Sequence, residues 1–201
     1  AVDTNTAQQA LDLYRQAELQ QYTLATYQLA CISISETLEP LDWSRLSERF
    51  AACCTQKNSS ALCDAAVFLG QFGTPSQKAI STGLLEASAL QGNTVAMALL
   101  GERLARGFCC APDPLRANSI RRLARELGLP VPAPDAAHGF ASPEPAEPAD
   151  MPAPFPALDL SQAVRAPEGT LLDERAQLMV FPELLSAEEC LYIQCLGGPQ
   201  L

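Results

Sequence analysis

The strongest constraint on the fold is a series of helix start and stop residues between positions 64 and 128. Thr74, Pro75 and Gln77 form the pattern of a capping box, with the proline at the first helical position. Asn93 and Asp113-Pro114 precede two further apolar segments. With the segment from residue 64 there are four such segments, and a glycine follows the end of each. The pattern predicts helices over 64–72, 75–91, 94–106 and 115–127.

Three more helices are expected upstream, because apolar residues recur there at helical spacing. The predicted ranges are 6–20, 22–33 and 41–54, with Glu39-Pro40 as a break and a loop at 57–60 that ends in a capping serine. Trp43 and the tyrosines at 14, 22 and 27 lie on helical stripes and are expected in the core. Residues 1–129 are therefore predicted to be all-α.

The helices also repeat in sequence. Leu69-Gly70 recurs as Leu100-Gly101, and the segment 86–92 is echoed by 123–128, a period of about 31–38 residues. Such a period is typical of stacked helix pairs, in which small residues at the crossing points let antiparallel helices approach closely.

This pattern resembles the Sel1-like repeat, a relative of the tetratricopeptide repeat. A first copy consists of Ala66, Leu69, Gly70, Gly73, Ala79, Ala87, Ala89 and Gly92. A second copy consists of Ala96, Leu100, Gly101, Gly107, Asp113, Ala117, Ala124 and Gly128. The resemblance implies a right-handed α-solenoid over 1–129 whose concave face binds a partner protein or peptide. The number of further, degenerate repeats within 1–60 stays open.

Residues 130–157 differ in composition from the rest of the chain. The stretch from Pro130 to Pro156 has nine prolines and neither lysine nor arginine. Such a segment buries too little apolar surface to fold, so we expect a disordered, extended acidic linker and a domain boundary. A proline-rich ligand for SH3-type modules is an alternative, although no basic residue flanks its PxxP motifs.

Residues 158–201 begin poorly patterned and end in a strand–helix element. Residues 178–181 predict a short strand, and Ser186 with Glu189 predicts a capping box at the start of a short helix. Its apolar side is expected to contain Cys190, Leu191, Ile193 and Leu196 and to pack on a sheet. Because no such sheet follows, the sequence predicts that 1–201 is a piece of a longer protein.

The same element resembles the entry to the catalytic domain of prolyl 4-hydroxylase-like Fe(II)/2-oxoglutarate dioxygenases. The matching residues are Phe181, Leu185, Ser186, Glu188, Glu189, Cys190, Pro199 and Leu201. Pro182-Glu183 departs from the family's phrase. The alternative is a generic capped helix that happens to contain a cysteine, in a stand-alone Sel1-like adaptor without catalysis.

The resemblance implies an oxygenase that uses Fe(II), 2-oxoglutarate and ascorbate and acts on a protein substrate presented by the solenoid. Its iron is held by two histidines and a carboxylate. The chain has one histidine, His138, in the proline-rich stretch. We therefore assign no catalytic, cofactor-binding or metal-binding residue within 1–201 and expect any such residues beyond Leu201.

Charge and cysteine content exclude some classes of function. The net charge of −10 argues against nucleic-acid binding, and no apolar run is long enough to cross a bilayer, so neither nucleic acid nor membrane is expected as a partner. Without a secretion signal, the eight cysteines are expected to be reduced, buried thiols of a cytoplasmic protein. A zinc site built from Cys53, Cys63 and Cys109 is an alternative.

The second repeat concentrates arginines, which form a candidate interaction patch. Its members are Arg103, Arg106, Arg121, Arg122 and Arg125, with Arg116 nearby. One interpretation is a groove for phosphate or an acidic peptide, and another is a solvated helix face. A third is that the patch binds the acidic linker or the catalytic domain, which predicts loss of linker binding after charge reversal of Arg121 and Arg122.

Overall fold

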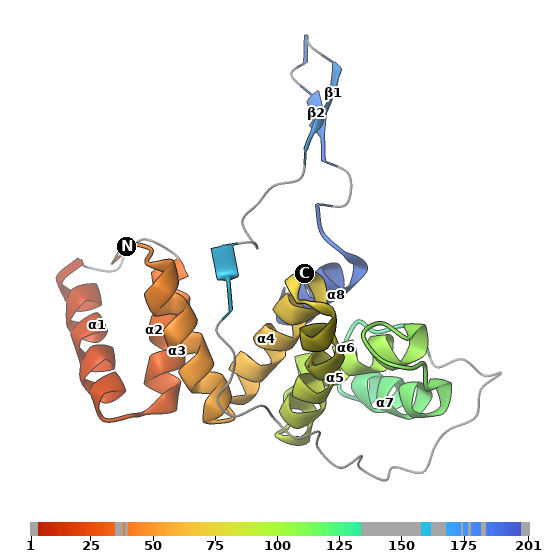
Figure 1. Cartoon of the computed structure of the whole chain (residues 1–201), viewed down its shortest axis with the longest axis horizontal. Helices are drawn as coiled ribbons and strands as arrows, with labels where there is room; N and C mark the ends of the chain where they lie inside the picture. The colour runs from red at the N-terminus through yellow and green to blue at the C-terminus, as the bar shows by residue number, and fades with distance from the viewer. Residues whose placement is uncertain are drawn as a thin grey trace.

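The computed structural model describes residues 4–34, 38, 40–133, 158–161, 168–173, 175–176, 178–181 and 184–197. These residues form eight helices and two strands. In chain order they are α1 (Thr4–Leu19), α2 (Thr23–Ile34), α3 (Trp43–Thr55), α4 (Ser59–Phe72), α5 (Pro75–Leu90), α6 (Thr94–Arg106), α7 (Pro114–Glu126), β1 (Thr170–Asp173), β2 (Leu178–Val180) and α8 (Ala187–Gly197). Helices α1 to α7 pack in sequence as antiparallel pairs, so the predicted helical organisation of this region is confirmed (Figure 1).

The predicted helix termini are local features, and most form as expected. Thr74 Oγ1 accepts from the backbone N–H of Gln77, whose side chain accepts from the backbone N–H of Thr74. Asn93 and Asp113 cap α6 and α7, with their side chains accepting from the backbone N–H groups of Ala96 and Arg116, without the reciprocal bond of a capping box. Gly107 ends α6 in the left-handed region, at φ 69°, which favours glycine.

One predicted start is wrong. The loop before α4 does not end in a capping serine, because Asn58 is the N-cap and its side chain accepts from the backbone N–H of Ala61. Ser59 and Ser60 are the first residues of the helix, which begins before the predicted residue 64. Asparagine caps helices as well as serine does, so composition alone could not choose between them.

The capping box of α5 makes a testable contribution to stability. We expect Thr74→Ala to lower the free energy of unfolding by about 1 kcal/mol, because an N-terminal backbone N–H loses its acceptor. Thr94→Ala is the matched control, since Thr94 is exposed and follows its own cap, Asn93. It should change the free energy of unfolding by less than about 0.5 kcal/mol in urea titrations. Equal losses in the two variants would contradict the capping role.

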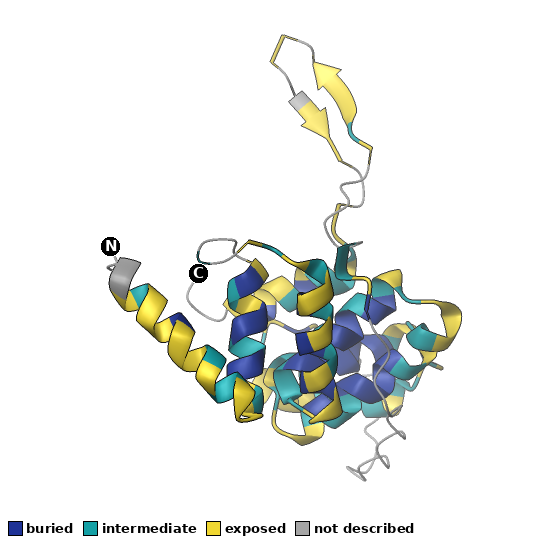
Figure 2. Ribbon diagram, turned by 60° about the vertical axis from the view of Figure 1, so that its left-hand side comes forward, coloured by how far each residue is buried: buried dark blue, intermediate teal, exposed yellow. Residues whose placement is uncertain are grey.

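The core lies between the helices and includes residues from beyond the proline-rich stretch. One cluster of buried residues extends from Ala30 of α2 to Leu191 and Cys195 of α8. Figure 2 shows the buried positions, in dark blue, gathered where the helices face one another. Trp43 and Tyr27 pack against it as partly buried residues, as predicted. Tyr14 and Tyr22 are exposed, so their predicted core positions are wrong. Leu11, Ala25 and Leu29 on the same stripes are buried, so the stripes face the core and only the two tyrosines lie at its exposed edge.

The segments after α7 attach to the helical body at separate points. Residues 134–157, with His138 and most of the predicted linker, lie outside the described residues. On either side of them, Val131 and Leu158 are buried, and Leu158 O accepts from Ser47 Oγ of α3 at 2.7 Å. The predicted strand is confirmed as β2, which pairs antiparallel with an unpredicted strand, β1.

The β1–β2 hairpin projects away from the helices (Figure 1), and the side chains of β1 are all exposed. Alternating burial is the usual sign of a strand in sequence. Because β1 has no buried face, it lacks that sign.

None of the helices in the described part of the chain has both the length and the apolar character needed to cross a membrane.

Candidate functional site

Helix α8 packs on the array of helices α1–α7, which we call the helical body. It contacts α6 and the side chains of Asp64 and Gln71 on α4. Glu188, Leu191, Tyr192 and Cys195 contact the body, and their spacing of three, four and seven residues places them on one helix face. Leu191 and Cys195 are buried in the shared core. We call the residues that receive this face, Asp64, Gln71, Arg103 and Phe108, the α8-binding surface.

Arg103 of α6 is the most buried charged residue of this surface, with 1% of its side chain exposed. It forms a two-point ion pair with Glu188, in which Nη2 lies 2.9 Å from Oε2 and Nε donates to Oε1. Its other hydrogen bonds run to Ser81 Oγ at 2.6 Å and to the Ala66 carbonyl oxygen at 2.7 Å. The guanidinium carbon lies 5.5 Å from the centre of the Phe108 ring. The body thus holds the guanidinium in place for a carboxylate.

Asp64 of α4 is the second polar contact, one turn further along α8. Its two carboxylate oxygens accept from the hydroxyls of Tyr27, at 2.8 Å, and of Tyr192. Burial raises the pKa of Asp64 above its ordinary value, although both hydrogen bonds act to lower it. Burial, followed by the nearby Asp64 charge, raises the pKa of both tyrosines, so they remain hydrogen-bond donors.

The cap of α8 confirms one prediction, and its packing shows contacts that the sequence did not indicate. Ser186 and Glu189 form the predicted capping box, and the same Glu189 oxygen accepts from Gln71 Nε2 at 3.2 Å. Of the predicted apolar side, Leu191 is buried, whereas Cys190, Ile193 and Leu196 are exposed. Within the described residues the helix packs on other helices through Leu191, Cys195 and the polar anchors Glu188 and Tyr192, and the sheet expected to cover its apolar side stays a prediction.

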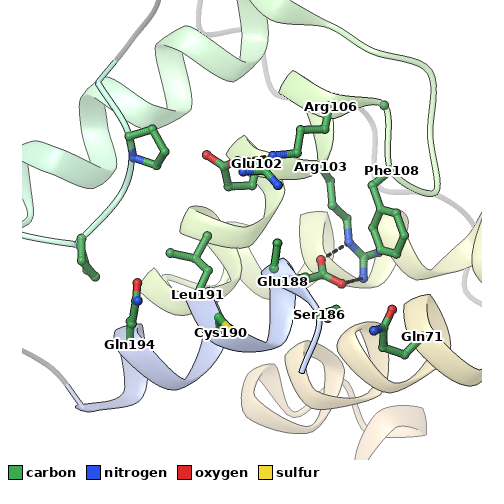
Figure 3. A pocket seen from close by; sticks show the side chains of 14 residues that line it. Gln71, Glu102, Arg103, Arg106, Phe108, Ser186, Glu188, Cys190, Leu191 and Gln194 are labelled. Atoms are coloured by element: carbon green, nitrogen blue, oxygen red, sulfur yellow. Dashed lines mark hydrogen bonds and ion pairs between the residues drawn. The ribbon is translucent and has the colours of Figure 1, made fainter. Parts of the chain in front are cut away.

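A cavity of about 540 Å³ lies beside this contact, between α6, α8 and residues 130–132 (Figure 3). Glu102 and Arg106 line it from α6, whereas Cys190 and Gln194 line it from α8. Its wall is close to neutral, because the acidic and basic groups on it are paired. Glu102 Oε1 accepts from Arg121 Nη2 at 2.7 Å, and Oε2 lies 3.0 Å from Arg106 Nε without accepting a hydrogen bond.

The five arginines of the predicted patch do not share one environment. Arg103 is buried against Glu188 and is not on a solvated face. Arg106 and Arg121 both pair with Glu102, and Arg125 donates to the carbonyl oxygen of Val131 at 3.1 Å. Arg122 is exposed on α7, and nearby Arg116 pairs with Glu86 at 2.9 Å. The structure brings only Arg103 and Arg106 to the α8 contact.

The cysteines are free thiols, but not all are buried. Cys53, Cys54, Cys63 and Cys195 are buried, while Cys31 and Cys190 are exposed, contrary to the prediction. Burial raises the pKa of Cys53 to about 11, so its thiol stays protonated. Among the described residues, no three histidine, cysteine or acidic side chains converge as a metal site, and the alternative zinc site at Cys53, Cys63 and Cys109 is not formed.

No known protein family matches this sequence, and no curated protein matches it either. The candidate site therefore depends on its own geometry. The sequence identified Glu188 only as part of the resemblance at the start of this helix, and it did not identify Asp64, Tyr192 or Ser81 at all. The one available signal was the spacing of Glu188, Leu191, Tyr192 and Cys195, but it does not reveal which element they face.

The raised pKa of Asp64 predicts a pH dependence of a defined sign. A carboxyl group whose folded pKa lies above its unfolded value, about 3.9, favours folding when protonated. We expect the wild type to gain stability relative to Asp64→Asn as the pH falls from 7 through the folded pKa towards 4.

Both variants contain the same other titratable groups, so the difference in their free energies of unfolding cancels the titration of those groups. Those facing Asp64 are Cys31 and Tyr27 on α2, Cys54 on α3, Cys63 on α4 and Tyr192 on α8. Urea unfolding of both variants at each pH is the measurement. A wild type that loses stability relative to the variant over this range would contradict the assignment.

Proposed function

We propose that the helical region of residues 1–129 is a protein-interaction scaffold, a right-handed α-solenoid of Sel1-like helix pairs. Its partner is a protein or peptide, and it carries no catalytic group of its own. The observation that supports this proposal most directly is the ion pair between Arg103 and Glu188, in which the body binds a helix through a buried guanidinium.

The contacts of α8 follow the general mode of helix recognition. In that mode an amphipathic helix presents anchors at i, i+3, i+4 and i+7 to a prepared surface. Glu188, Leu191, Tyr192 and Cys195 have this spacing. Asp64 and Arg103 supply complementary polar groups, and the core supplies the apolar contact. A scaffold that holds one helix in this manner is suited to hold others.

A second candidate function is the non-catalytic part of a prolyl 4-hydroxylase-like Fe(II)/2-oxoglutarate oxygenase. It is favoured by the strand β2 followed by the capped start of α8, the order that the resemblance implies. The residues present do not fit the iron, since two histidines are needed and the chain has only His138. In this case α8 would anchor a catalytic domain to the scaffold, and the domain itself would bind iron, 2-oxoglutarate and ascorbate.

The scaffold proposal is tested with a photo-crosslinking residue in the full chain. Position 106 borders the cavity, and position 57 is a matched exposed site in the α3–α4 turn. We expect position 106 to crosslink a discrete protein that peptide sequencing identifies and that excess unlabelled chain displaces. Crosslinks only within the chain, or equal capture from both positions, would argue against a partner site beside α8.

The oxygenase candidate is tested separately. The coding sequence beyond Leu201 should contain H-x-D and a later histidine, and the product of the whole gene should consume 2-oxoglutarate in the presence of Fe(II). A gene that lacks these ligands leaves the adaptor function alone.

A further inference from the structure

Two buried arginines in this protein are held in nearly the same way. Arg49 of α3 donates through Nη1 to Ser33 Oγ at 2.8 Å and through Nε to Glu18 Oε1 at 2.8 Å. Arg103 of α6 donates through the same two nitrogens to Ser81 Oγ and Glu188 Oε1. In each case the serine lies on the preceding helix. The arrangement is therefore a repeated device: a buried guanidinium fixed by a serine and completed by a carboxylate.

The two devices differ in where the carboxylate comes from. Glu18 belongs to α1, a neighbouring helix of the same array, whereas Glu188 belongs to α8, far along the chain. Gly70 of α4 makes room for the second arrangement. A Cβ at this position would lie 2.5 Å from Arg103 Nη2 and 3.2 Å from Glu188 Oε2. In the first site the carboxylate comes from within α1–α7. In the second site the carboxylate comes from α8, a helix outside that array.

We propose that the α8-binding surface recognises an acidic amphipathic helix of a partner protein and that α8 is its intramolecular competitor. The partner helix carries a glutamate for Arg103, an apolar residue three positions later, a tyrosine for Asp64 at the fourth, and a small apolar residue at the seventh. This inference deepens the proposed scaffold function and depends on it. The ligand class is defined by charge complementarity with Arg103 and by the hydrogen-bond acceptor at Asp64.

The attachment of α8 suits exchange with such a partner. Only Leu191 and Cys195 of α8 are buried, and Ile193 and Leu196 remain exposed. The described residues of the exposed β1–β2 hairpin that precedes α8 do not belong to the core cluster. A helix of this length is marginal alone in water, so its order depends on the surface. Tethering keeps its effective concentration high, and a partner must outcompete it.

The test uses a fluorescent peptide of residues 184–197 and the full chain, with binding followed by anisotropy. The same substitution should act in opposite directions in the two molecules. Glu188→Ala in the chain weakens the competitor and should raise peptide affinity by up to about a hundredfold, whereas Glu188→Ala in the peptide should lower it about a hundredfold. Leu191→Ala is the second variant. It should raise peptide affinity when placed in the chain and lower it when placed in the peptide, and it leaves the ion pair between Arg103 and Glu188 intact.

Gln194→Ala is the matched control, because Gln194 is exposed on α8 and forms no hydrogen bond with Arg103 or Asp64. It should change affinity less than about twofold in either molecule. Circular dichroism establishes that the chain variants keep their helices.

The inference is overturned if the peptide fails to bind a chain variant whose α8 is weakened, or if Glu188→Ala in the peptide leaves affinity unchanged. Either failure contradicts only the proposed helix ligand of the α8-binding surface, because crosslinking from position 106 measures partner binding independently. Conversely, peptide binding without a crosslinked partner would show that the surface binds α8 and would count against both the partner helix and the scaffold function.

Discussion

Glu188→Ala is expected to release α8 from the helical body while α1–α7 stay folded. The variant leaves Arg103, 1% exposed, without its carboxylate partner. Leaving one member of a buried ion pair unpaired costs about 3 kcal/mol or more, which lowers the equilibrium constant for α8 binding roughly a hundredfold. Release of α8 lets water reach the guanidinium, so the loss appears as local opening rather than global unfolding.

Two cysteines of α8 provide the measurement. Cys195 is 7% exposed and burial raises its pKa, whereas Cys190 is exposed on the same helix. In the wild type, alkylation followed by mass spectrometry should modify Cys190 much faster than Cys195. In Glu188→Ala the two rates should approach each other. Glu126→Ala on the exposed face of α7 is the charge-matched control and should leave the ratio unchanged. Continued protection of Cys195 in Glu188→Ala would show that the ion pair does not hold α8.

Arg49→Ala is expected to destabilise the first three helices by about 3 kcal/mol, at the lower end for a buried pair because Glu18 is 22% exposed. The substitution removes a side chain that joins α3 to both Ser33 of α2 and Glu18 of α1. Hydrogen exchange should show faster exchange in α1 and α2, and urea unfolding should report the loss of free energy.

Arg45→Ala provides the control for Arg49→Ala, because Arg45 lies 3.8 Å from the same Glu18 carboxylate but is 50% exposed. An exposed ion pair contributes at most about 1 kcal/mol, so this variant should remain close to the wild type. Equal losses of unfolding free energy in the two variants would show that the buried hydrogen bonds of Arg49 add no stability beyond an ion pair with Glu18.

The helical array was largely predictable because its signals are local. The capping box of Thr74 and Gln77, the N-cap Asn93 and the left-handed Gly107 each act within one turn of a helix end. The error at α4 has the same origin, since Asn58 and the serines that follow it all have the chemistry of a cap. Local chemistry places a helix boundary within a few residues and leaves the choice among adjacent caps to the packed structure.

The sequence by itself determined the helical class of the first region, the boundaries of most helices and the capped start of α8, because short-range hydrogen bonds and apolar spacing specify them. Only the tertiary structure decided that α8 packs on α6, that Arg103 is buried against Glu188, and that Asp64 joins Tyr27 to Tyr192. These contacts join residues far apart in the chain, and a charged side chain looks the same in sequence whether it faces water or a buried partner. Burial changes the energetic role of Arg103, and burial is a property of the packed helices together.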